Sequence, residues 1–61
     1  MELEDDEIKA ALITFDNVAS EWTIDPSLDS HKPQVSTIRK LKQEAEKRNL
    51  DYKLHSDISE F

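Results

Sequence analysis

The sequence predicts an all-α protein: a two-helix antiparallel hairpin followed by a short extended or weakly helical C-terminal tail. Two stretches carry apolar residues at helical spacing, with a proline-containing stretch between them. The chain has no glycine and only two prolines, so the tight turns of an all-β fold have few residues to build them. Its 61 residues are enough for one domain, residues 1–61.

The first helix is expected over residues 5–22. Acidic residues crowd its start, where the positive end of the helix dipole favours them, and Asp5 or Asp6 is expected to supply the N-cap. Apolar residues recur every three or four positions and so form one continuous stripe. The stripe consists of Ile8, Ala11, Leu12, Phe15, Val18, Ala19 and Trp22.

Residues 23–32 are expected to form a loop. Pro26 disfavours helix at the residue before it, and the surrounding Asp and Ser residues are typical of turns. Ile24 and Leu28 are expected to anchor this loop on the core. The histidines His31 and His55 are both expected to be exposed in loops.

The second helix is expected over residues 33–48, with Pro33 at its first position. Its stripe is Val35, Ile38, Leu41, Lys42 and Ala45, with Lys42 reaching toward solvent at the edge. Asn49 suits the left-handed position just after the helix. Leu50 would then close back on Ala45 in a Schellman motif.

The tail, residues 49–61, is less regular. Polar and apolar residues alternate over 51–55, which indicates a short strand, and residues 56–61 could form a short third helix. The alternative fold is therefore a small α+β domain with strands at 21–24 and 52–54. A chain this short has a thin core and no cysteine to cross-link it, so self-association or a partner is expected to complete the fold.

Charge is distributed unevenly along the chain. Residues 1–30 hold nine acidic residues against Lys9 alone, a net charge of −8. Residues 31–53 hold seven basic residues against three acidic ones, a net charge of +4. Attraction between the halves can set their orientation, but it cannot neutralise the acidic half.

This asymmetry predicts a small acidic regulatory or adaptor protein that binds another protein, for example to inhibit a larger partner with a basic surface. The expected partner-binding residues are Glu4, Asp5, Asp6, Glu7, Asp16, Glu21 and Trp22. Trp22 is included because it ends the apolar stripe beside a loop, where so large a ring is hard to cover. The partner could be a second copy of the chain or a different protein.

The alternative function is nucleic-acid binding by the basic second helix. Its surface would consist of Arg39, Lys40, Lys42, Lys47 and Arg48. The sequence isoelectric point near 4.7 and the acids Glu44 and Glu46 within the helix argue against it, since phosphate contacts dominate such binding.

No arrangement of residues predicts catalysis, a metal site or a cofactor. Ser30 adjoins His31 and Ser56 adjoins His55, but neighbours in sequence do not make a nucleophile and base. Two histidines 24 residues apart, without cysteine, match no metal-ligand spacing. The acidic start is unlike a signal peptide and no apolar run could cross a bilayer, so a cytoplasmic location is expected, or a nuclear one in a eukaryote.

Overall fold

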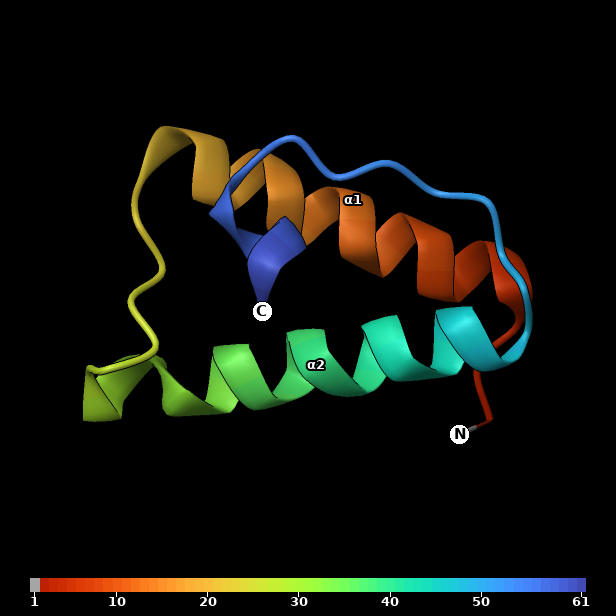
Figure 1. The fold of residues 1–61 in the computed structure, drawn as a ribbon, viewed down its shortest axis with the longest axis horizontal. Helices are drawn as coiled ribbons and strands as arrows, with labels where there is room; N and C mark the ends of the chain where they lie inside the picture. The colour runs from red at the N-terminus through yellow and green to blue at the C-terminus, as the bar shows by residue number, and fades with distance from the viewer. Residues whose placement is uncertain (1) are drawn as a thin grey trace.

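A computed structural model describes residues 2–61 and confirms the all-α hairpin (Figure 1). Helix α1 (Asp5–Glu21) and helix α2 (Lys32–Lys47) lie side by side and antiparallel. Two short 3-10 turns complete the fold, η1 (Asp29–His31) before α2 and η2 (Asp57–Glu60) near the end of the chain. No strand forms in residues 2–61, so the α+β alternative is wrong.

Helix α1 begins at Asp5, as predicted, but its N-cap lies one residue before the expected ones. Glu4 is the N-cap, not Asp5 or Asp6, and its main-chain N–H donates to Oε1 of Glu7 at 2.9 Å. A glutamate three residues into a helix reaches back to the cap in this way because the two positions lie one turn apart. The helix ends at Glu21, and Trp22 is already extended, with φ −152° and ψ 151°.

The end of α2 follows the sequence prediction closely. Asn49 has a φ of 56°, in the left-handed region. The Leu50 N–H donates to the Ala45 oxygen at 2.9 Å, and the Asn49 N–H donates to the Glu46 oxygen at 3.1 Å. These two bonds are the pair that defines a Schellman motif, which is confirmed. At its other end α2 starts at Lys32, one residue before the expected start. Because η1 occupies Asp29–His31, the irregular loop between the helices is shorter than the expected residues 23–32.

The core consists of two adjoining clusters between the helices. One contains Ile8, Leu12, Leu41 and Ala45, and the other contains Ile24, Val35, Ile38 and Ile58. Phe15 and Leu54 pack against both clusters and so join them. Burial of these side chains is the main source of stability, since each buried valine, leucine or isoleucine contributes roughly 1.5–3 kcal/mol.

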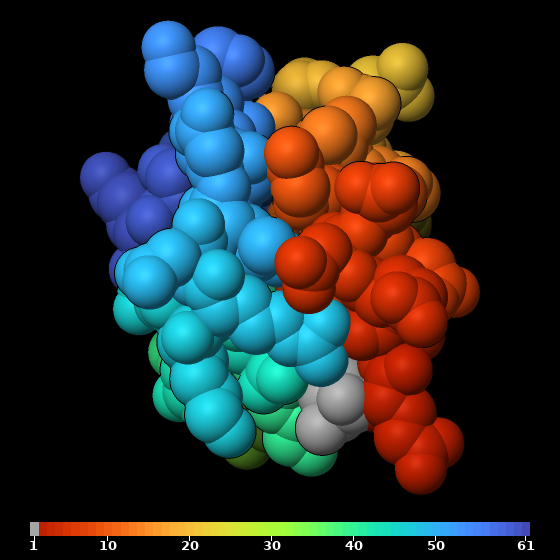
Figure 2. All heavy atoms as spheres, turned by 90° about the vertical axis from the view of Figure 1, so that its right-hand side faces the viewer, coloured from red at the N-terminus to blue at the C-terminus, as the bar shows by residue number. Residues whose placement is uncertain are grey.

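The tail crosses back over the hairpin and does not form the expected strand. It runs along α1 and then turns in toward α2, where η2 closes the core (Figures 1 and 2). The alternation that suggested a strand is real, because Tyr52 and Leu54 pack inward while Lys53 and His55 are exposed. An extended segment lying on a helical surface alternates in the same way as a strand, so the pattern alone could not distinguish them.

The loop between the helices is held by polar contacts of its own. Asp25 Oδ1 accepts hydrogen bonds from the Ser27 N–H at 2.9 Å and the Ser27 hydroxyl at 2.7 Å. The Asp25 N–H in turn donates to Nδ1 of His31 at 3.0 Å, and His31 is half-buried rather than exposed as expected. Ile24 is buried as expected, but Leu28 is 46% exposed and does not anchor the loop.

Candidate functional site

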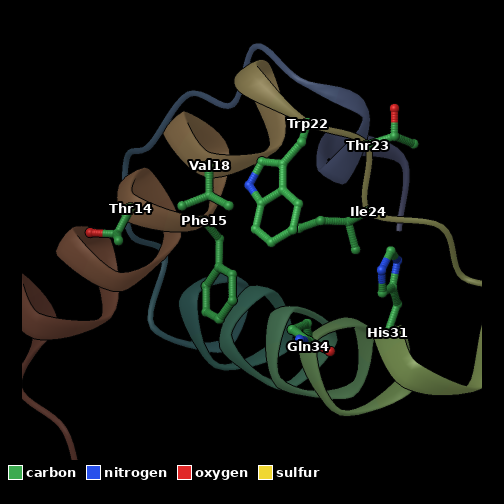
Figure 3. A pocket seen from close by; sticks show the side chains of 8 residues that line it. All are labelled: Thr14, Phe15, Val18, Trp22, Thr23, Ile24, His31 and Gln34. Atoms are coloured by element: carbon green, nitrogen blue, oxygen red, sulfur yellow. The ribbon is translucent and has the colours of Figure 1, made fainter.

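An apolar hollow lies between the C-terminal end of α1 and the N-terminal end of α2 (Figure 3). Thr14, Phe15 and Val18 line it from α1, and His31 and Gln34 from the other side. The extended residues Trp22, Thr23 and Ile24, which follow α1, complete the wall. Its volume is about 120 Å³, close to the roughly 150 Å³ of an apolar cavity that accepts benzene.

Trp22 is the most exposed large apolar side chain in the described part of the chain. It remains 64% exposed although it continues the apolar stripe of α1. The reason is local: the helix ends at Glu21, so the extended backbone of Trp22 carries the indole to the mouth of the hollow. Figure 3 shows the rings of Trp22, Phe15 and His31 directed into the same space.

The polar groups around the hollow are largely satisfied within the protein. The Thr14 hydroxyl donates to the Ala10 oxygen one turn earlier, at 2.8 Å. The Nδ1 atom of His31 already accepts a hydrogen bond from Asp25. The Gln34 amide, in the orientation that pairs donor with acceptor, reaches the main-chain oxygen of His31 at 3.0 Å. The hollow therefore offers a ligand apolar contact rather than a set of hydrogen bonds.

The expected partner-binding residues do not form one patch. Glu4, Asp5, Asp6 and Glu7 lie at the start of α1, whereas Glu21 and Trp22 lie at its end. Seventeen residues of helix, at about 1.5 Å each, separate the two groups by roughly 25 Å. All six side chains are exposed.

Asp16 is absent from both groups because it is buried, with 7% of its surface exposed. Its carboxylate accepts hydrogen bonds from the N–H groups of His55 at 2.9 Å and Ser56 at 2.7 Å. Burial works to raise the pKa of Asp16, but hydrogen bonds from Ser56 and from the His55 N–H together hold that pKa below its usual value. The Ser56 hydroxyl oxygen is itself buried and makes no hydrogen bond of good geometry within residues 2–61.

Arg48 neutralises part of the acidic group at the start of α1. Its guanidinium lies 3.0 Å from Asp5 Oδ1 and 3.0 Å from Glu44 Oε1, and it donates to the Leu3 oxygen at 2.6 Å. The hydrogen bond to Asp5 is the main reason that the pKa of Arg48 is raised. Arg48 therefore ties the two chain segments at this end of the hairpin together.

Lys42 also has a structural role that the sequence did not indicate. Its ammonium donates to the main-chain oxygens of Ser59 at 2.8 Å, Phe61 at 3.1 Å and Ile58 at 3.3 Å. Of the five residues in the alternative basic surface, Lys42 and Arg48 are thus occupied inside the protein. Arg39, Lys40 and Lys47 remain exposed on α2.

One signal in the sequence could have identified Asp16 as structural. It stands four residues after Leu12 and eight after Ile8, so it occupies a core position of the α1 stripe. An acid at such a position needs buried donors. Nothing local to Lys42 or Asp16 could show that the donors and acceptors come from residues 55–61, because those contacts span at least 16 positions.

No group of three or more His, Cys, Asp or Glu side chains among residues 2–61 could hold a metal ion. None of their helices is both long enough and apolar enough to cross a membrane. Comparisons with protein-family models, with curated proteins and with solved structures find no match to this chain.

Proposed function

We propose that this protein works as a small regulator or adaptor that binds another protein through the apolar hollow and the Trp22 side chain at its mouth. The observation that carries the proposal is the 64% exposure of Trp22 beside a preformed apolar hollow. Tryptophan is enriched among the residues that dominate binding energy at protein interfaces, and such residues insert into or surround apolar pockets.

The exposed acids support a partner with a basic surface. Asp5 is paired with Arg48 and Asp29 with Lys32, at 3.0 and 2.9 Å. Glu2, Asp6 and Glu21 are exposed and have no ion pair within residues 2–61. Unpaired surface charge of one sign attracts an oppositely charged partner and speeds encounter with it.

The rival function, nucleic-acid binding by α2, has less support. Two of its five basic residues hold the protein together, and the remaining three share the helix with Glu44 and Glu46. Binding to phosphates grows with the number of free cations that release counterions. Three exposed cations on a protein of net charge −6 are a weak basis for such binding.

The experiment is quantitative capture of partners from a lysate with the purified chain, before and after nuclease treatment. We expect a stoichiometric protein partner that survives nuclease and whose capture falls strongly with Trp22→Ala. Ile13→Ala is the matched control, because Ile13 is 46% exposed on α1 but does not line the hollow. Capture that is abolished by nuclease, or that is insensitive to Trp22→Ala but lost with Arg39→Glu, would support the rival function instead.

A further inference from the structure

We propose that the occupant of the apolar hollow is a basic segment of a partner protein that inserts one large aliphatic or aromatic side chain. The inference rests on the proposed function and names the chemistry of the partner. It combines three features of the hollow: its size, the nature of its walls and the charges around it.

The size of the hollow suits a single side chain. A volume of about 120 Å³ is slightly below the roughly 150 Å³ that holds a benzene molecule. Leucine, isoleucine, methionine or phenylalanine could enter, with Trp22 closing over the inserted group from the rim. A larger ligand would have to extend beyond the hollow onto the surface.

The walls select an apolar group. Phe15, Val18 and Ile24 supply apolar surface, and the hydroxyl of Thr14 is turned back to its own helix. A polar ligand that entered would lose its hydrogen bonds to water and find few in exchange, which costs free energy. An apolar side chain has no hydrogen bonds to water to lose, and burial of its surface is favourable.

The charges around the hollow select the rest of the segment. No lysine or arginine lines it. Of the charged residues next in sequence to its lining residues Trp22, Ile24 and His31, Glu21 and Asp25 are acidic, and the cation Lys32 is paired with Asp29 at 2.9 Å. Another surface hollow, over α2, is lined by Lys32, Arg39 and Lys40 and by no acid. A basic segment is therefore attracted to the side that holds the apolar hollow and repelled from the basic side.

A second copy of this chain does not fit this description. Its exposed large apolar side chains are Leu3, Ile13, Trp22 and Leu28. All four lie within residues 1–30, which contain nine acidic residues and a single lysine. Insertion of any of them would bring negative charge against Glu21 and Asp25, so like-charge repulsion opposes a homodimer through this hollow.

Synthetic peptides test the proposal directly, because Trp22 is the only tryptophan and reports on the hollow by its fluorescence. Three short peptides are compared: one leucine flanked by lysines, the same leucine flanked by glutamates, and the lysine peptide with serine in place of leucine. We expect the lysine–leucine peptide to shift the Trp22 emission to the blue and to bind at least about tenfold more tightly than either of the others. Its affinity should fall as salt is added.

Two variants with the same change of charge locate the binding. Val18→Lys places a cation in the hollow and should weaken the lysine–leucine peptide about tenfold or more. Ile13→Lys places the same cation on an exposed part of α1 that does not line the hollow, and should change the affinity much less. Far-ultraviolet circular dichroism checks that both variants remain folded.

Several results would overturn the inference. They are equal binding of the leucine and serine peptides, equal binding of the lysine and glutamate peptides, or equal effects of the two variants. An emission shift that depends on protein concentration alone would show that a second copy fills the hollow. If the peptides fail while Trp22→Ala still abolishes capture of a cellular protein, the partner chemistry is wrong and the proposed function stands.

Discussion

The carboxylate of Asp16 accepts a 2.7 Å hydrogen bond from the main-chain N–H of Ser56, which lies forty residues further along the chain. Ser56 is the N-cap of η2, so Asp16 places a negative charge at the N-terminal end of that turn. Lys42 places a positive charge on the oxygens at the other end. The two helices of the hairpin thus hold the last turn of the chain by its two ends, each with the charge that the peptide dipoles favour.

Replacement of Asp16 should destabilise the whole protein. In Asp16→Asn the acceptor loses its charge, and the bonds from His55 and Ser56 weaken at a buried position. We expect a loss of about 1–3 kcal/mol in the free energy of unfolding, measured by urea denaturation. Asp6→Asn removes the same charge from an exposed position of α1 and should change that free energy by less than about 0.5 kcal/mol.

The same carboxylate should make stability depend on acidity. The folded protein holds the pKa of Asp16 below its usual 3.8, so the unfolded chain takes up this proton first as the pH falls. The stabilisation is therefore complete above about pH 4 and is lost as the pH falls through the lower pKa of the folded state. Unfolding free energies between about pH 2 and pH 6 should show this slope.

Asp16→Asn should reduce that slope but leave part of it. The pKa of Asp25 is also lowered, by hydrogen bonds from the Ser27 hydroxyl and the Ser27 N–H, so Asp25 contributes to the same pH range. A slope that is identical in wild type and Asp16→Asn would contradict the assignment of the acid sensitivity to Asp16.

Lys42→Met should loosen the end of the chain while leaving the hairpin in place. The variant keeps the aliphatic part of the side chain but removes the donor to Ile58, Ser59 and Phe61. Amide hydrogen exchange within η2 should become roughly tenfold faster, which corresponds to about 1.4 kcal/mol. Lys40→Met is the control, since Lys40 is exposed on the same helix and should leave the exchange rates unchanged.

Asn49 tests the left-handed turn that ends α2. Its φ of 56° is unfavourable for residues with a Cβ other than Asn and Asp, so Asn49→Ala should cost roughly 1 kcal/mol. Asn49→Gly should be close to neutral, because glycine adopts this backbone freely. Asn17→Ala, the same substitution inside α1, should be neutral or stabilising in thermal melts, since alanine favours helix.

Charge reversal distinguishes the acidic surface from the basic one in partner binding. Asp6→Lys with Glu21→Lys should slow association with the captured partner at low salt, because neither side chain makes an ion pair within residues 2–61. Reversal of Arg39 and Lys40 should have little effect on that rate. Reversal of Asp5 or Glu7 would be a poorer test, since Asp5 pairs with Arg48 and Glu7 caps α1.

The parts of the fold that depend on neighbouring residues could be predicted from the sequence. Both helices, and the Schellman motif at Asn49, follow from apolar spacing and from backbone preferences within a few residues. The path of the tail could not be predicted, because it depends on contacts of Asp16 and Lys42 with residues 16 to 40 positions away. An alternating pattern fits both a strand and an extended segment lying on helices.

The candidate site was only partly predictable for the same reason. Trp22 could be singled out because it ends a stripe beside a loop, and its exposure agrees with that expectation. The hollow itself could not, since it forms where Phe15, His31 and Gln34 meet from separate elements. Asp16 was predicted to lie on the acidic surface because only its charge was considered, although its position on the α1 stripe indicated the core, where it lies.

Ile24 and Phe15 contribute both to the hollow and to the core beneath the tail, which connects these two parts of the molecule. Both side chains line the hollow, and both belong to or pack against the cluster that includes Ile58 of η2. A partner side chain bound as proposed would therefore contact residues that also pack against the tail, so the two equilibria would be coupled. By thermodynamic reciprocity, the factor by which occupation of the hollow changes the docking equilibrium of η2 equals the factor by which docking of η2 changes the affinity of the hollow.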